Sequence, residues 1–241
     1  MLKCSDCGGN HCLKKVPLFS SLEEDEMMKI TQRMVFENYV RGQDILSQGK
    51  TPRGITIICK GRAKGYRLTV NGGEKILYLF AQHDYIGEQY LFVNKKAAYT
   101  VTALENVKTA FFSKKQFQEL LQLYPAIALK LIEDLGSRTI SLENILQTGG
   151  ARKTQSRIAA MLSDFGRKYG KRSEEGVEIN LPLSREGMAN YLGMARETLS
   201  RRLSAFEDQG VIRSLGNKKI VILKPDLLKK SAEDELEIPE K

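Results

Sequence analysis

Residues 183–203 constrain the fold of this chain more than any other segment, because they contain two short helical stretches separated by Gly193. Glycine tolerates the backbone conformations that a tight turn between helices needs. The second stretch is amphipathic, with Leu199, Leu203 and Phe206 at helical spacing on one face. The opposite face carries a polar set at positions i, i+1, i+4 and i+5, namely Arg196, Glu197, Ser200 and Arg201. The pattern predicts a helix-turn-helix.

The polar set on the second helix has the chemistry of a base-reading surface. Arginine pairs bidentately with guanine, glutamate accepts from cytosine, and serine adapts to several bases. A solvated amphipathic helix with ordinary surface charges is the alternative interpretation. The turn glycine, the preceding helix and the basic hairpin that follows favour binding to double-stranded DNA. We expect Ser184, Lys218 and Lys219 to hold phosphates beside the bases that the helix reads.

Charge is distributed unevenly along the 241 residues, whose net charge is +9. Residues 149–230 hold 17 Lys and Arg residues against 9 Asp and Glu residues, so the helix-turn-helix lies in the most basic region. Neutralisation of DNA phosphates requires such a surface. The acidic segment 231–241 is expected to be a disordered, solvated tail.

The length of the chain allows two modest domains, each with its own core. No apolar run approaches the roughly 18 residues of a membrane span. The polar N-terminus lacks the apolar core of a signal peptide. We therefore expect a cytoplasmic protein without a membrane partner. In that compartment its four cysteines are more often metal ligands or redox-active thiols than disulfides.

Short β-prone runs alternate with glycines over the first half of the chain. Strands are predicted for 55–59, 63–70, 75–80 and 99–112, with Asn71-Gly72 as a hairpin turn. Many short strands with glycine turns are typical of an antiparallel barrel or roll. The pattern predicts an α+β fold. A cysteine-rich segment at 1–15 comes first, and an antiparallel β-roll over 16–122 follows it. The roll includes a helical lead-in at 16–37 and a short helix at 114–122.

A long helix is predicted over 123–148, with Pro125 in its first turn. Side chains at alternating spacings of three and four residues suggest a seam between two helices, formed by Leu131, Leu135, Arg138, Leu142 and Ile145. We interpret this stretch as a dimerisation helix, and a helix packed on its own domain is the alternative. Residues 148–150 are the expected hinge to a winged helix-turn-helix domain over 149–230.

The order of a glycine-punctuated β-roll, a long helix and a winged helix-turn-helix resembles the CRP/FNR family of bacterial transcription regulators. The most specific matches are residues 80–88, FAQHDYIGE, and residues 191–201, YLGMARETLSR. The resemblance covers residues 16 to 230. It implies a β-roll like that of cyclic-nucleotide-binding proteins, a homodimer, a palindromic DNA site and contact with RNA polymerase.

The second helix of the helix-turn-helix is similar to that of the FNR branch through Glu197, Ser200 and Arg201. Arg196 and Arg201 also match the branch that responds to nucleotides. The similarity implies a half-site of the TTGA or TGTGA kind. Members of the family often have Thr or Ser in front of this helix, where this chain has Ala195.

The β-roll departs from the nucleotide-responsive members of the family. Those members carry an Arg-Ser pair shortly after a Gly-Glu turn, and the pair holds the nucleotide phosphate. This chain keeps Gly87 and Glu88 but has Ala97 and Ala98 at the place of the pair. Because alanine cannot neutralise a buried phosphate, we expect no binding of cAMP.

Three cysteines, Cys4, Cys7 and Cys12, are spaced C-x2-C-x4-C near the N-terminus. Thiolates packed this closely can bind one soft ion or cluster. The FNR branch carries a similar triplet with a fourth cysteine late in the roll, and it assembles an oxygen-labile iron–sulfur cluster. Here the late-roll stretch 106–112 has no cysteine, and the fourth cysteine is Cys59 in an earlier strand.

We therefore predict that the chain senses oxygen or redox state through an iron–sulfur cluster, of the [4Fe–4S] type. Its ligands would be Cys4, Cys7, Cys12 and Cys59, or three cysteines with another ligand. The alternatives are a thiol–disulfide switch that uses Cys59, a zinc site that includes His11, a small-molecule effector other than cAMP, and cysteines without a sensing role.

Two other functional classes fit the sequence less well. The two histidines belong to no nucleophile motif and the chain has no phosphate loop, so we do not expect an enzyme. A ligand-responsive module whose C-terminal domain contacts protein is a remote alternative. The positive charge of residues 149–230 argues against it.

Overall fold

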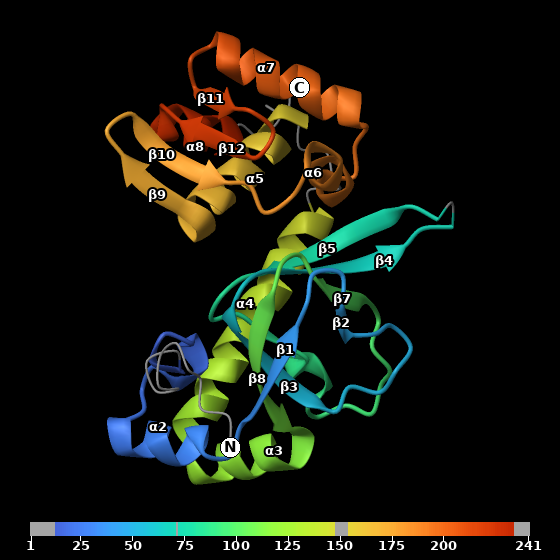
Figure 1. Cartoon of the computed structure of the whole chain (residues 1–241), viewed down its shortest axis with the longest axis vertical. Coiled ribbons are helices and arrows are strands. Elements are labelled where there is room, and N and C mark those ends of the chain that lie inside the picture. The colour runs from blue at the N-terminus through green and yellow to red at the C-terminus, as the bar shows by residue number, and fades with distance from the viewer. Residues whose placement is uncertain (1–12, 71, 148–153, 234–241) are drawn as a thin grey trace, which may run out of the picture. The chain divides into compact units, whose positions relative to one another are not determined.

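The computed structural model describes residues 13–70, 72–147 and 154–233. The chain divides into two compact units, 1–143 and 144–241 (Figure 1). Among the described residues, no helix is both long enough and apolar enough to cross a membrane. The predicted hinge at 148–150 and the tail beyond residue 233 lie outside the described residues.

Two four-stranded antiparallel sheets form the first unit, so the predicted β-roll is confirmed. One sheet has the order β1 (Val35–Tyr39), β8 (Val107–Ser113), β3 (Gly54–Lys60) and β6 (Tyr85–Ile86). The other has the order β2 (Asp44–Leu46), β7 (Thr100–Ala103), β4 (Ala63–Leu68) and β5 (Glu74–Phe80). β4 pairs with β5 on either side of the predicted hairpin turn, of which Asn71 lies outside the described residues.

Helical segments precede and follow the strands of this unit, and one short segment lies between β6 and β7. They are η1 (Pro17–Phe19), α2 (Glu24–Thr31), η2 (Glu88–Tyr90), α3 (Lys114–Leu123) and α4 (Pro125–Gln147). A capping box fixes the start of α3, because Ser113 and Gln116 each accept a hydrogen bond from the backbone of the other. The side chains that fill the larger core come from both the helices and the first sheet.

Two boundaries in this unit differ from the sequence-based prediction. The segment expected to be helical up to residue 37 ends its helix at Thr31, and its last residues enter β1, where Phe36 pairs with Ala110. The run 99–112, expected as one strand, is divided between β7 and β8. Strand pairing, which helical or apolar spacing does not report, decides both boundaries.

The long helix α4 lies close to the predicted range, but its apolar residues face two directions. Leu131 is 2% exposed and belongs to the core of its own unit, and Leu135 packs against that core. Assigning Leu131 to a seam between two chains was therefore wrong, because helical periodicity does not say which partner an apolar face covers. The exposed apolar residues of α4 are Leu129, Ile132 and Ile140. The side chains of Leu142 and Ile145 are outside the described part of the structure.

The second unit is a small winged-helix domain around one antiparallel sheet. The sheet has the order β11 (Ile212–Leu215), β12 (Lys219–Ile222), β10 (Gly176–Asn180) and β9 (Gly170–Ser173). Its helices are α5 (Thr154–Tyr169), α6 (Arg185–Leu192), α7 (Arg196–Asp208) and α8 (Pro225–Glu233). β9 and α8 are absent from the elements predicted from the sequence, and α8 packs against α5.

Candidate functional site

The helix-turn-helix of the second unit consists of α6, a turn and α7. Ser184 caps α6, because its Oγ accepts a hydrogen bond from the backbone N–H of Gly187 at 3.1 Å. Gly193 ends α6 with φ of 62°, in the left-handed region that glycine adopts without strain. Its N–H donates to carbonyls of the last turn of α6. The two predicted helices and the turn between them are confirmed.

Helix α7 buries one face and exposes the other, as its amphipathic spacing predicted. Leu199, Leu203 and Phe206 are at most 2% exposed. The four residues of the predicted base-reading face are all exposed: Arg196, Glu197, Ser200 and Arg201. Burial of the apolar face fixes the rotation of the helix about its axis, so these four side chains project from the domain together.

The first turn of α7 has no side-chain cap. Ala195 occupies the N-cap position in an extended conformation and cannot accept a hydrogen bond through its side chain. Glu197 lies in this first turn, where a carboxylate interacts favourably with the helix dipole. Glu197 therefore offsets part of the missing cap.

Helix α5 holds the helix-turn-helix in place through contacts that the sequence analysis did not include. The Arg157 guanidinium donates to the carbonyl of Leu192, at the end of α6. The rings of Phe165 and Tyr191 pack with their centroids 6.2 Å apart. No periodicity signals the Arg157 contact, because a backbone carbonyl carries no sequence information.

The hairpin of β11 and β12 forms the predicted wing. Lys218 is exposed in its turn, and the backbone carbonyl of Lys218 accepts from Leu181 at 2.8 Å. Lys219 instead pairs with Glu178 of β10, with Nζ 2.7 Å from Oε1. Lys218 therefore carries its charge free of that pair, whereas Lys219 would have to leave Glu178 before it could bind a phosphate.

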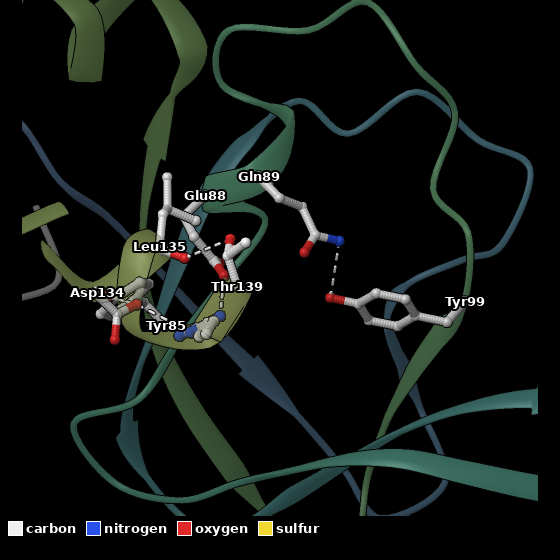
Figure 2. A network of polar contacts seen from close by, with 8 residues as sticks. Tyr85, Glu88, Gln89, Tyr99, Asp134, Leu135 and Thr139 are labelled. Atoms are coloured by element: carbon white, nitrogen blue, oxygen red, sulfur yellow. Dashed lines mark hydrogen bonds and ion pairs between the residues drawn. The ribbon is translucent and has the colours of Figure 1, made fainter. Parts of the chain in front are cut away.

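In the first unit, a polar network joins the turn after β6 to α4. Glu88 of η2 is 2% exposed, and its Oε1 accepts from the Arg138 guanidinium. Arg138 Nε also pairs with Asp134 at 3.0 Å, and the Tyr85 hydroxyl donates to Asp134 at 2.6 Å. Figure 2 shows Tyr85 and Glu88 on the roll beside Asp134 on α4.

Electrostatics within this network favour a charged Arg138. Burial raises the pKa of the Glu88 carboxyl, and the Arg138 charge opposes that rise. Burial alone lowers the pKa of Arg138, but Glu88 and Asp134 raise it above its ordinary value. In the described part of the chain, Glu88 Oε2 has no hydrogen-bond partner. Glu88 therefore depends on Arg138 for the compensation of its charge.

In the described part of the chain, Ala97 and Ala98 form hydrogen bonds to neutral groups. The Ala97 N–H donates to the carbonyl of Lys50 at 2.8 Å, and its own carbonyl accepts from Gly49 at 2.9 Å. The Ala98 N–H donates to the Tyr90 hydroxyl at 2.9 Å. Backbone hydrogen bonds within the roll thus organise this loop without a cationic side chain at these two positions.

Of the four cysteines, only Cys59 lies within the described residues. Its side chain is 6% exposed and belongs to the core that also contains Leu13 and Val16. Cys59 sits at a bulge of β3, where the strand pairs with Lys108 and Thr109 of β8. Cys4, Cys7, Cys12 and His11 fall outside the described residues, and within those residues no group of three or more His, Cys, Asp or Glu side chains could hold a metal ion.

Comparisons with known proteins match both units. A cyclic nucleotide-binding domain model matches residues 36–124, and a Crp-like helix-turn-helix domain model matches residues 156–231. The transcriptional activator protein FnrL of Cereibacter sphaeroides is 25% identical over 224 residues, or 91% of this chain and 88% of FnrL. This chain belongs to the CRP/FNR family. It is a DNA-binding transcription regulator and not an enzyme.

Two further comparisons match about four fifths of this chain. A global nitrogen regulator of Nostoc is 26% identical over 193 residues, or 79% of this chain and 86% of that protein. The structure of FixK2 from Bradyrhizobium japonicum shares the fold with a TM-score of 0.71 at 19% identity, over 82% of this chain and 96% of FixK2. These comparisons therefore support a transcription regulator but do not tell which signal this chain senses.

Proposed function

We propose that this CRP/FNR regulator binds a palindromic DNA site as a homodimer and senses oxygen or redox state through its cysteines. DNA binding is supported by one observation: α7 exposes its polar face and buries the opposite, apolar face. Arg196, Glu197, Ser200 and Arg201 read a half-site of the TTGA or TGTGA kind. Phosphates are held by Ser184, Lys218 and Lys219, and the bound dimer contacts RNA polymerase.

The exposed apolar side of α4 supports the dimer. Ile132 and Ile140 lie eight residues apart, which places them on one side of an α-helix, and Leu129 shares that side. Each of the three is more than half exposed in the single chain. Two such helices related by a twofold axis would bury the same residues on both partners. A twofold dimer in turn matches a palindromic operator.

Placing a charge on this side of α4 should dissociate the dimer. Ile132→Glu and Ile140→Glu, alone and combined, would bury a carboxylate opposite its own symmetry mate, so we expect monomers in sedimentation equilibrium. Ser137→Glu is the matched control, because it adds the same charge where α4 lines a pocket with Pro17 and Leu18 of its own unit. A doubly substituted protein that sediments like the wild type would refute this interface.

The position of Cys59 supports a cysteine-based sensor. The resemblance to the FNR branch implies a fourth cysteine late in the roll, and β8 has none. Cys59 lies on β3, the strand that pairs with β8, opposite Lys108 and Thr109. Leu13, which directly follows Cys12, belongs to the same core as Cys59. A thiolate supplied from the neighbouring strand would therefore replace the missing ligand of an iron–sulfur cluster.

Protein isolated without oxygen should show broad visible absorbance that bleaches in air, together with bound iron and sulfide. Cys59→Ser should lose most of this absorbance, because a hydroxyl is a poor ligand for iron–sulfur clusters. Ala110→Ser, which adds a hydroxyl elsewhere in the same core, is the control for the cost of a buried polar group. We expect this variant to keep its cluster.

Two other experimental outcomes would indicate a sensor other than an iron–sulfur cluster. A colourless wild-type protein with bound zinc would indicate a zinc site. A colourless protein without metal, in which mass spectrometry of the unfolded chain finds Cys59 in a disulfide after mild oxidation, would indicate a disulfide switch. Full cluster content in Cys59→Ser would assign the fourth ligand to another residue.

A cyclic nucleotide is not part of the proposal. Glu88 is already engaged by Arg138, and Ala97 and Ala98 offer no cation for a phosphate, while the side chains of the preceding Lys95 and Lys96 are exposed. An uncompensated phosphate at such a place is costly. We therefore expect neither cAMP nor its analogues to change the affinity of this regulator for DNA.

A further inference from the structure

The wing and the helix-turn-helix are connected by a hydrogen bond that involves none of the four base-reading residues. Arg185 is the first residue of α6, directly after the cap Ser184, and its guanidinium is half-buried. Arg185 Nη2 donates to the Ser214 hydroxyl at 2.9 Å. Ser214 belongs to β11 and pairs with Ile220 of β12, so it lies close to the wing turn that carries Lys218.

Glu207 extends this connection to α7. Glu207 Oε1 accepts from the backbone N–H of Ser214 at 2.7 Å, and its charge also favours the cationic form of Arg185. Burial is the larger influence and lowers the pKa of Arg185 from its ordinary value. Arg185 Nη1 is buried and has no hydrogen-bond partner in the described part of the chain. The half-buried guanidinium is therefore in a costly environment, and among the described residues Ser214 accepts a direct hydrogen bond from it.

We propose that Arg185 is a positioning residue that sets the distance between two phosphate contacts of this domain. One contact is Ser184, which is adjacent to Arg185, and the other is Lys218 on the wing, near Ser214. The hydrogen bond between Arg185 and Ser214 joins the two local structures directly. This role rests on the proposed phosphate contacts of Ser184 and Lys218. Arg185 itself contacts neither a base nor a phosphate in the proposed complex.

Loss of this hydrogen bond should free the wing without removing any DNA-contacting side chain. Ser214→Ala deletes one hydroxyl from a half-buried position of β11 and keeps Arg185. The wing would then keep its strand pairing and the hydrogen bond from the Ser214 N–H to Glu207, but it would lose its side-chain link to α6. Lys218 would contribute less to phosphate neutralisation, while the face of α7 would still discriminate between bases.

The test is the salt dependence of DNA binding by the full chain, with a matched set of variants. Each phosphate contact contributes about 0.9 to the slope of log K against log salt concentration. We expect Lys218→Ala to lower the slope by about two for a dimer, counting one contact per protomer. Ser214→Ala should lower it by a similar amount, and the double variant should lose no more than Lys218→Ala alone.

Two further measurements separate positioning from a general loss of stability. Ser214→Thr restores the hydroxyl in a strand-compatible residue and should recover the wild-type slope. Base discrimination, measured as the affinity ratio between the preferred site and one with a substituted half-site, should stay at the wild-type value in Ser214→Ala. A variant that was merely unfolded would lose discrimination and slope together.

Each contrary result has a distinct meaning. A wild-type slope in Ser214→Ala, with a lowered slope in Lys218→Ala, would overturn the positioning role of Arg185 and leave the wing contact intact. Additive losses in the double variant would overturn it as well. A wild-type slope in Lys218→Ala would refute the proposed phosphate contact of the wing, and the positioning role would fail with it.

Discussion

Replacing Arg138 by methionine should lower the free energy of unfolding of the β-roll by about 2–4 kcal/mol. The substitution keeps an aliphatic stem on α4 but leaves the Glu88 carboxylate, 2% exposed, without its cation. Removing one partner of a buried pair is strongly destabilising, and the 41% exposure of the Arg138 side chain moderates the cost through solvent screening. Hydrogen-exchange protection of the roll amides measures the loss in this unit separately from the rest of the chain.

Two controls isolate the cause of this loss. Combining Arg138→Met with Glu88→Gln removes the uncompensated charge, so the double variant should be more stable than Arg138→Met alone. Lys130→Met removes a cation from an exposed pair with Glu133 on the same helix and should cost under about 1 kcal/mol. Equal protection in wild type and Arg138→Met would show that the ion pair contributes nothing to the stability of the roll.

Arg201→Ala should weaken binding to the preferred DNA site by about 1–3 kcal/mol per half-site, which is roughly 5- to 150-fold. Arg201 is exposed on the polar face of α7 and offers the bidentate donor pair that guanine accepts. The loss should come with relaxed specificity at one base pair. Competition binding at fixed salt, with all four bases tested at each half-site position, measures both effects.

Arg202→Ala is the matched control for this prediction. Arg202 is the same residue type, is also exposed, and lies one position along α7, which turns it away from the polar face. Its loss should reduce affinity for all sequences alike, if at all. If Arg201→Ala kept the wild-type preference at every position, the assignment of the recognition face would be wrong.

The helix-turn-helix could be predicted closely from the sequence because its determinants are local. Gly193 marks the turn, Ser184 marks a helix start, and Leu199, Leu203 and Phe206 define the buried face of α7. Each of these signals acts within a few residues, through capping, backbone conformation or helical periodicity. The orientation of the exposed polar face follows from the same three apolar residues.

Contacts between residues that are distant along the chain could not be predicted from the sequence. The periodicity of α4 placed Leu131 and Arg138 on one helix. It could not show that Leu131 packs in the core of its own unit or that Arg138 pairs with Glu88. Lys219 was equally basic in the sequence, yet strand pairing places Glu178 beside it. In both cases the deciding residue lies about 40 to 50 positions away along the chain.

The two-sided use of α4 bears on how regulators of this kind can be recombined. Of its 23 residues, some complete the roll beneath it and others remain available to a second chain. A chimera joined at Asn144, the start of the second unit, would inherit the described part of both sides with the roll to which they belong. A joint at Pro125 would instead pack the α4 of another protein on this roll, and Glu88 would lose its pairing with Arg138. The natural unit of inheritance is therefore the roll together with its helix.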